Sequence, residues 1–207
     1  QTEEEQIDAI KAWWDQNGKS LLITLALALS AVFGVNTWME RQQQMAEAAS
    51  MSYQSMLTAY EAKSEEASAL GRAVIQNYSS SHYATLAALR LAKAELEAGD
   101  LSVAEAQLQW VISNSVEPIF VDVARLRLAR LLLSGQRNDE VSLLLDQVTT
   151  TNLSALVDEI RGDLLLQQGD RDAARSLYSS ALAGYAQVSS KQPLLQMKID
   201  DLTPVAQ

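Results

Sequence analysis

The side chains that most often perform catalysis or bind metals are scarce in this sequence. It contains one histidine, His82, and no cysteine among its 207 residues. His82 follows Ser79, Ser80 and Ser81, and a histidine beside a serine is one arrangement that activates a nucleophile. No orienting partner is evident, however, and a histidine metal site needs further ligands that the chain lacks. We therefore interpret His82 as a solvated residue in a connector before a helix.

Neighbouring carboxylates are the second pattern with catalytic potential. They occur as Glu65–Glu66, Asp158–Glu159 and Asp200–Asp201. Consecutive residues on a helix point about 100° apart, so these pairs predict solvated faces and not acid–base dyads. The sequence also contains no glycine-rich phosphate loop and no EF-hand loop. These observations predict a protein that is not an enzyme, with no catalytic residue, metal site or cofactor.

Composition narrows the function classes further. Acidic residues outnumber basic residues by 21 to 14 in residues 40–207, and no basic stripe is present. Nucleic-acid binding requires a positive surface, so this class is not expected. The chain holds three prolines and eight glycines and is dominated by good helix formers. This composition is typical of an all-helical protein.

The most informative segment is the charge-free run from Ser20 to Met39. Twenty helical residues span about 30 Å, the thickness of the hydrocarbon core of a bilayer. Trp13 and Trp14 precede the run and Trp38 ends it, as expected of aromatic residues at the two membrane interfaces. The run therefore predicts a transmembrane helix in contact with the lipid bilayer.

Two alternatives to a membrane anchor were weighed. A buried core helix of this length is possible, but apolar side chains surround the run on every face, without the single stripe of an amphipathic helix. A cleaved signal peptide would carry a positive N-terminal region, whereas the residues before the run are net negative. Lys11 and Lys19 against Arg41 slightly favour an N-terminus on the cytoplasmic side. We thus expect a cytoplasmic segment 1–18, a transmembrane helix 19–39 and, in a bacterial inner membrane, a periplasmic domain 40–207.

Three glycines mark a repeat in the part beyond the anchor. Gly99, Gly135 and Gly169 are separated by 36 and 34 residues, and each lies between two apolar, helix-like stretches. We expect each glycine to adopt the left-handed conformation that ends one helix. Asp100, Asp139 and Asp170 suit the start of the following helix. A period near 34 residues with two helices per unit is typical of tetratricopeptide repeats.

The third unit carries the most specific form of the pattern. Gly162 stands where the first helix needs a small residue, and Ala174, Tyr178 and Ala181 occupy the small, aromatic and small positions of the second. The second unit is degenerate, and a generic antiparallel bundle is the alternative. Two further helices are expected near 42–62 and 65–77, and a capping helix near 194–202. The predicted fold is all-α: a single N-terminal transmembrane helix, then a tetratricopeptide-like α-solenoid of antiparallel helix pairs with a C-terminal capping helix.

The first helices of such units line the concave face, where partners usually bind. The register above predicts a partner-binding groove with an apolar floor and mixed charge at its rim. Its candidate residues are Leu86, Leu89, Lys93, Leu96, Arg125, Leu132, Leu133, Leu156, Glu159, Asp163 and Leu166. Any single leucine among them could instead pack between adjacent units. As a set they suit an extended polypeptide or a helix of a partner.

Four strings together resemble one family. They are EEQIDAIKAWWDQNGKSL before the apolar run, RLRLARLLL, IRGDLLLQQGDRDAARSLYSSAL and the terminal QMKIDDL. In this combination they are similar to the YfgM family of ancillary subunits of the Sec translocon. The resemblance implies a single-span inner-membrane protein with a periplasmic tetratricopeptide-like domain. It also implies as partners the channel subunits of the Sec translocon and a membrane-anchored periplasmic chaperone of the prolyl-isomerase type.

The leading hypothesis is therefore a membrane-tethered scaffold at the protein-export channel. It would hold the chaperone, and emerging polypeptides, near the exit of the channel, where tethering raises the effective concentration. The alternative is a signalling adaptor whose N-terminal tail binds a cytosolic protein. Ile7, Ile10, Trp13 and Trp14 lie at helical spacing and could form such a docking face, or an interfacial membrane helix.

Overall fold

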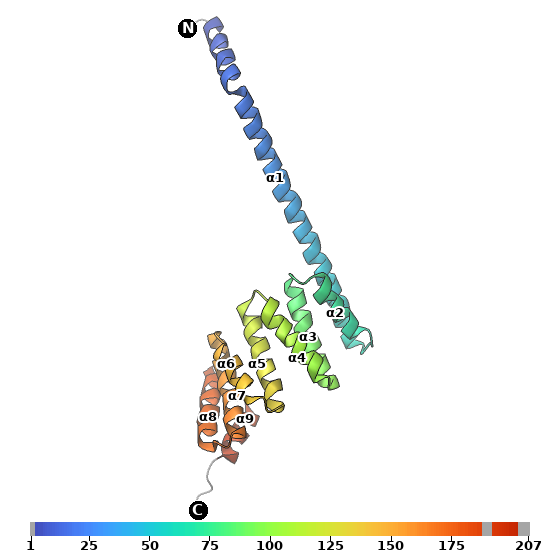
Figure 1. The fold of residues 1–207 in the computed structure, drawn as a ribbon, viewed down its shortest axis with the longest axis vertical. Coiled ribbons are helices and arrows are strands. Elements are labelled where there is room, and N and C mark those ends of the chain that lie inside the picture. Colours follow the sequence, from blue (N-terminus) through green and yellow to red (C-terminus); the bar gives the residue numbers. More distant parts are fainter. Residues whose placement is uncertain (1–2, 188–191, 203–207) are drawn as a thin grey trace, which may run out of the picture. The chain divides into compact units, whose positions relative to one another are not determined.

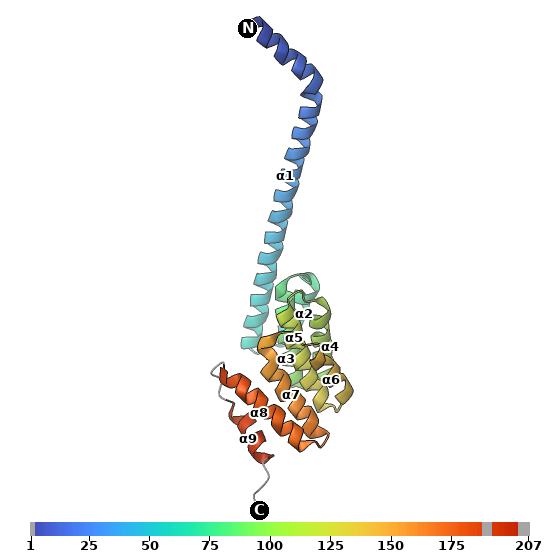
Figure 2. The same ribbon diagram turned by 90° about the vertical axis from the view of Figure 1, so that its left-hand side faces the viewer.

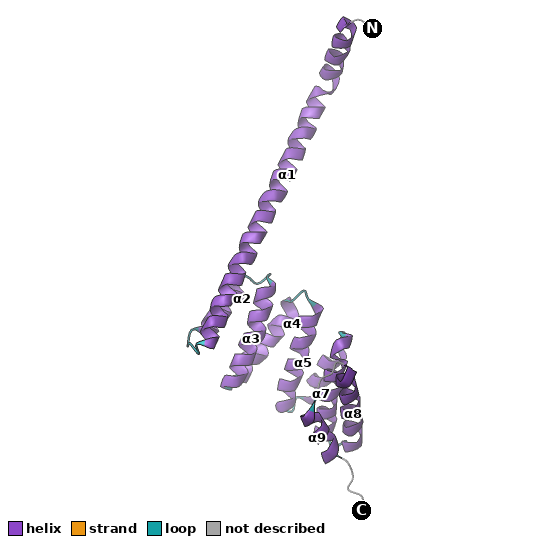
Figure 3. Cartoon of the chain, turned by 180° about the vertical axis from the view of Figure 1, so that it is seen from behind, coloured by secondary structure: helices purple, strands orange, loops and turns teal. Residues whose placement is uncertain are grey.

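The computed structural model describes residues 3–187 and 192–202, and within this part all regular structure is helical (Figure 1). The elements are α1 (Glu3–Glu61), α2 (Ala67–Asn77), α3 (His82–Ala98), α4 (Leu101–Asn114), α5 (Pro118–Ser134), α6 (Asn138–Asp146), the 3-10 helix η1 (Thr151–Leu153), α7 (Ser154–Gln167), α8 (Arg171–Gln187) and α9 (Pro193–Asp201). Short turns join them, with no strand among the described residues (Figure 3). The prediction of an all-α fold is confirmed.

The long helix α1 contains the apolar run. Among the described residues, α1 is the one helix that is long and apolar enough to cross a membrane. None of its most apolar window is buried in the protein. Contacts divide the chain into a unit of residues 1–48 and a unit of residues 49–207, so α1 contributes to both. The expected transmembrane helix 19–39 and the helix expected near 42–62 are therefore one continuous helix, which ends at Glu61. Met56, near the end of α1, is fully buried and contacts Gly71 of α2.

The second unit consists of successive antiparallel helix pairs. Contacts join α3 to α4, α5 to α6 and α7 to α8, and the pairs meet through α4·α5 and α5·α7. One apolar core runs from the end of α1 to α7 and includes Leu91, Leu132 and Ile160. A separate small core joins α8 and α9 around Tyr178 and Ile199. Helices α8 and α9 lie beside one another (Figure 2). The expected capping helix is therefore present as α9.

The turns between paired helices follow the prediction at two of three glycines. Gly99 and Gly169 have φ angles of 87° and 90°, which only glycine adopts without strain. Asp100 accepts a hydrogen bond from the Val103 N–H, and Asp170 accepts one from the Ala173 N–H, so both cap the next helix as predicted.

The second turn is built differently. Gly135 has φ −91°, and its neighbour Gln136 adopts the left-handed conformation with φ 59°. The prediction for Gly135 is therefore wrong, because the chain reverses one residue later. Asp139 is also not a cap, since it lies in the first turn of α6, where its charge still suits the helix dipole.

The small and aromatic positions of the third unit are confirmed. Ala174, Tyr178 and Ala181 are fully buried in α8. Gly162 of α7 faces the Tyr178 ring so closely that a Cβ atom at this position would lie 2.5 Å from Tyr178 Cε1. The aromatic ring thus occupies the space that the missing side chain leaves.

Candidate functional site

Helices α3, α4 and α5 line an open cavity of about 540 Å³ in the unit of residues 49–207. Ala104 and Leu108 of α4 are buried and form its floor. Leu96 of α3 and Leu131 of α5 form apolar walls, and Leu96 remains 49% exposed. The cavity also borders Ala92 and Ser134. Its apolar surface is therefore accessible to a partner and not filled by the protein itself.

Three cations complete the lining of this cavity: Lys93, Arg127 and Arg130. Lys93 is 3.6 Å from Glu97 on its own helix, in an exposed pair of little expected strength. Arg127 donates a long hydrogen bond of 3.4 Å to the Leu89 carbonyl. Burial, followed by repulsion from Arg130, lowers the pKa of Arg127 from its usual value. The guanidinium group thus lies where its charge is poorly compensated.

Two of the four groove residues predicted on α3, Lys93 and Leu96, line the cavity. That they bind a partner stays a prediction. Leu89 is 6% exposed and belongs to the main core, so it does not point into the groove. Leu86 is half-buried outside the cavity lining. Leu89 thus follows the packing alternative that the sequence left open.

On α5 the predicted face is rotated away from the cavity. Arg125, Leu132 and Leu133 do not line it, and Leu132 is only 2% exposed within the core. Two lining residues of α5 follow lining residues of α3 by 35 positions: Arg127 follows Ala92, and Leu131 follows Leu96. The spacing of 36 between Gly99 and Gly135 instead pairs Leu96 with Leu132, one residue too far along. One residue is about 100° of rotation, enough to exchange the groove face for the core face.

Arg125 has a structural role instead. Its Nη1 contacts Asp122 at 2.7 Å and donates to the Gln147 carbonyl at 3.0 Å. Asp122 is fully buried and accepts hydrogen bonds from the backbone N–H and hydroxyl groups of both Thr149 and Thr150. Burial alone would raise the pKa of Asp122, but these hydrogen bonds and Arg125 lower it to about 2. This clamp fixes the connection that leads into α7.

The acidic residues predicted on α7 are engaged by other parts of the protein. Glu159 accepts a hydrogen bond from the Tyr185 hydroxyl at 2.8 Å and lies 3.6 Å from Arg130. Asp163 accepts hydrogen bonds from the Tyr178 hydroxyl and from Lys198 of α9. These residues therefore form a closed polar cluster and not an open groove.

The two predicted leucines of α7 also pack inside the protein. Leu156 lies against the main core, and Leu166 lies against the small core of α8 and α9. Both are half-buried. The accessible groove thus ends before the third unit, because Leu156 packs against the main core and α8 and α9 engage Glu159, Asp163 and Leu166.

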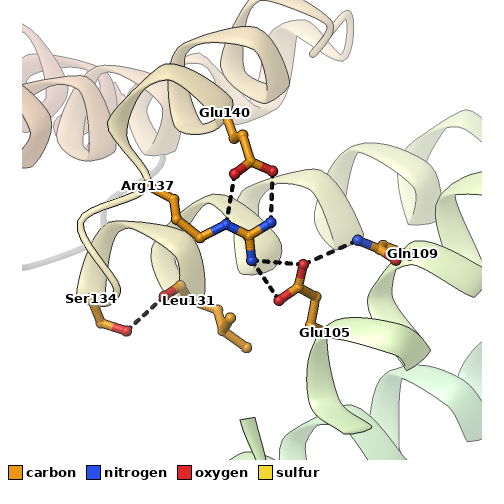
Figure 4. A network of polar contacts seen from close by, with 6 residues as sticks. All are labelled: Glu105, Gln109, Leu131, Ser134, Arg137 and Glu140. Carbon is orange, nitrogen blue, oxygen red and sulfur yellow. Dashed lines mark hydrogen bonds and ion pairs between the residues drawn. The ribbon is translucent and has the colours of Figure 1, made fainter. Parts of the chain in front are cut away.

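A second polar network holds the turn that borders the groove. Arg137 contacts Glu105 of α4 through two hydrogen bonds of 2.8 and 2.9 Å and Glu140 of α6 through two of 2.6 and 2.7 Å (Figure 4). The hydrogen bonds from Arg137 lower the pKa of Glu140. The sequence pattern did not indicate this network, because Glu105 of α4 is distant along the chain from Arg137 and Glu140. The network links α4 to the short helix α6 across the degenerate second unit.

Comparison with known proteins decides the family. Residues 11–204 match the family described as a tetratricopeptide repeat-like domain. The ancillary SecYEG translocon subunit of Escherichia coli K12 is 30% identical over 204 residues, which cover 98% of both chains. Proteins with the same name from Aggregatibacter actinomycetemcomitans and Neisseria gonorrhoeae are 30% and 31% identical, over 97% of each chain.

The chain belongs to the family of ancillary SecYEG translocon subunits. This confirms the resemblance and agrees with the prediction of a protein that is not an enzyme, since the relatives are named as accessory subunits. No solved structure matches the chain significantly. The helical arrangement described above is therefore informative for the family as well.

The remaining predicted residues lie on exposed surfaces of this family member. Trp13, Trp14 and Trp38 are 52%, 49% and 63% exposed on α1, and their placement at membrane interfaces stays a prediction. His82 is exposed and lies against the Tyr83 ring, with 4.1 Å between centroids. Ser81 accepts a hydrogen bond from the Tyr83 N–H and caps α3. Ser81 is thus the N-cap of α3, and His82 is an exposed first residue of this helix and not part of the connector before it.

Proposed function

We propose that this protein is a membrane-anchored scaffold of the SecYEG translocon that binds partners through the cavity between α3, α4 and α5. The observation that carries the proposal is an open apolar cavity, with Leu96 and Leu131 in its walls, on a chain whose relatives are named as subunits of this translocon. Its partners are the translocon channel subunits, a membrane-anchored periplasmic chaperone of the prolyl-isomerase type, and emerging polypeptides.

The proposed topology places residues 1–18 in the cytoplasm, residues 19–39 in the bacterial inner membrane and residues 40–207 in the periplasm. The apolar, unburied window of α1 supports the span. Lys11 and Lys19 before the span, against Arg41 after it, favour the orientation. Because the chain has no native cysteine, single introduced cysteines test this directly. In intact spheroplasts a membrane-impermeant maleimide should label Lys63→Cys and leave Asp8→Cys unlabelled. The reverse pattern would contradict the topology.

Site-specific photocrosslinking tests the binding function. A photoreactive amino acid at Leu96 or Leu131 of the full chain in native membranes should crosslink to a channel subunit, the chaperone or a translocating polypeptide. Leu194 on α9 is the control position, because it is 73% exposed and lies outside the cavity lining. The proposal fails if the two cavity positions crosslink to none of these proteins.

The adaptor reading remains a second candidate because of one observation. Ile7, Ile10, Trp13 and Trp14 are about half exposed or more along the start of α1. They can contact either a cytosolic protein or the membrane interface. Deleting residues 1–12 separates the two functions, since a scaffold keeps its crosslinks from Leu96 and Leu131 whereas an adaptor loses its cytosolic partner.

A further inference from the structure

The charge of the cavity differs from that of the chain around it. The whole chain carries a formal net charge of −10. Among the described residues that line the cavity, none is Asp or Glu, and Lys93, Arg127 and Arg130 supply three positive charges. Lys93 comes from α3 and the two arginines from α5, so the cations face the cavity from both walls. The cavity is thus a small positive site on an acidic protein.

These cations lack strong partners within the protein. Arg127 has the 3.4 Å hydrogen bond to the Leu89 carbonyl, and Arg130 and Lys93 each have one carboxylate at 3.6 Å. By contrast, Arg137 makes four hydrogen bonds of 2.6 to 2.9 Å to two carboxylates. Arg127 also experiences the positive charge of Arg130 one turn further along α5. A bound carboxylate would relieve this repulsion and supply the planar acceptor that a guanidinium fork matches.

The apolar part of the cavity specifies the rest of the ligand. Leu96, Leu108 and Leu131 offer a hydrophobic surface directly beside the cations. A simple anion would satisfy the charges and leave this surface in contact with water. An apolar side chain that enters the cavity would remove this surface from water, which favours binding. The site therefore suits a ligand that carries both groups.

We propose that the cavity binds an unfolded or extended peptide segment in which carboxylate side chains flank a large apolar residue. The apolar side chain enters between Leu96 and Leu131, and the carboxylates contact Arg127, Arg130 and Lys93. The inference rests on the proposed binding function and adds the chemistry that selects the segment. Segments of the same hydrophobicity with basic flanks are rejected by the three cations.

Peptide binding to the full chain in detergent tests this selection. The probe is a fluorescent peptide in which Leu is flanked by Glu in a Gly and Ser background, and its two analogues carry Gln or Lys instead of Glu. We expect the Glu peptide to bind about tenfold more tightly than the Lys peptide, by fluorescence anisotropy, and the difference to shrink as salt is added.

Charge reversal assigns the preference to this cavity. Arg127→Glu should weaken binding of the Glu peptide about tenfold and strengthen binding of the Lys peptide. Lys93→Glu should change both affinities in the same direction. Lys63→Glu changes the net charge equally but lies in the turn after α1, outside the cavity lining, and should change neither affinity. Circular dichroism checks the folding of each variant, and Lys93→Glu decides the result if Arg127→Glu fails to fold.

Three results would overturn the inference: equal binding of the Glu and Lys peptides, unchanged binding by both charge-reversed variants, or full displacement of the Glu peptide by inorganic phosphate alone. The photocrosslinks separate this failure from that of the proposed function. If Leu96 and Leu131 still crosslink to the channel or the chaperone, the scaffold function stands and only the ligand chemistry is wrong.

Discussion

The cavity of α3, α4 and α5 and the polar cluster on α7 are both lined by charged side chains, but they use them in opposite ways. In the cavity, Lys93, Arg127 and Arg130 have long or exposed contacts. In the cluster, Asp163 accepts hydrogen bonds from a buried tyrosine and a lysine of the capping helix. The first region is left incomplete by the protein, and the second is completed by α8 and α9.

The difference shows that successive units of one solenoid can have different roles, one in binding and one in closing the end of the stack. A surface that must bind a partner keeps apolar and charged groups accessible, because the partner satisfies them. A surface at the end of the stack must be closed by the chain itself, since terminal repeats need a cap. The contacts of the charged residues, more than their number, therefore distinguish a candidate binding surface from a structural one.

We expect the largest effect from removing the side chain of Asp122, which fixes the segment that leads into α7 and its polar cluster. Asp122→Ala leaves the backbone N–H groups of Thr149 and Thr150 without their acceptor and Arg125 with the Gln147 carbonyl but no carboxylate. We expect a cost of about 3 kcal/mol in the free energy of unfolding. Urea titration of the full chain in detergent, followed by circular dichroism, measures this loss. Asp146→Ala is the control, because its pair with Arg161 is exposed and its removal should cost less than about 0.5 kcal/mol. Equal losses would contradict the buried clamp.

Adding one methyl group to α7 at Gly162 should destabilise the packing of α7 against α8. Gly162→Ala forces a Cβ atom against the Tyr178 ring, and we expect a loss of about 2 kcal/mol in the free energy of unfolding. Helix propensity alone predicts the opposite sign, a gain of about 1 kcal/mol. Gly135→Ala in the second turn has φ −91° and ordinary contacts, and the same urea titration should show no loss for it. A gain in stability for Gly162→Ala would disprove the close packing.

Lowering the pH should reduce the free energy of unfolding, because Asp122 becomes protonated. The pKa of Asp122 is about 2 in the folded protein, below its usual value of 3.8, so its contribution is present above pH 4 and is lost as the pH falls toward 2. The difference corresponds to about 2 kcal/mol. Thermal or urea unfolding between pH 5 and pH 2 measures it, with Asp122→Asn as the reference. A variant that loses stability as steeply as the wild type would assign the loss to other carboxylates.

Replacing one lysine in each region compares directly how much the two regions contribute to stability. Lys198→Ala removes the contacts of α9 with Asp163 and the Tyr178 ring and should cost about 1 kcal/mol in the free energy of unfolding, given its partial exposure. Lys93→Ala in the cavity should leave stability unchanged. Limited proteolysis gives an independent measurement, since release of α9 exposes the end of the chain. Similar stability of the two variants would remove the distinction between the regions.

The smallest effect is expected at the centre of the cavity. Arg127→Gln removes a charge that is repelled by Arg130, so the free energy of unfolding should stay within about 0.5 kcal/mol of the wild type or rise slightly. Thermal unfolding of the full chain provides the measurement. A loss above about 1 kcal/mol would show that Arg127 supports the fold, and that its position in the cavity is incidental.

Much of the fold was predictable because the signals are local. The apolar run, the glycines at 99 and 169 and the aspartates after them specify helix ends through conformational preferences of single residues. Gly162 and Tyr178 were predictable because two helices meet at a distance that only small residues permit. These features depend on nearest neighbours along the chain or within one helix pair.

The site was predicted less well because it depends on rotation about the helix axis. Lys93 and Leu96 of the predicted groove line the cavity, whereas the residues predicted on α5 do not. Arg127, Arg130 and Leu131 line it instead, and the sequence pattern did not indicate them. The offset between lining positions, 35 residues, is visible only when the helices are packed. The role of α7 was also hidden, since Glu159 and Asp163 contact α8 and α9 across long stretches of sequence.

The Asp122 clamp has a consequence for how the protein opens. Thr149 and Thr150 lie outside the α-helices, where backbone amides normally exchange with solvent hydrogen quickly. Here both amides donate to a buried carboxylate of α5, so their exchange requires the segment after α6 to separate from α5. Two amides outside the helices thus report on the opening of the second helix pair at its exit.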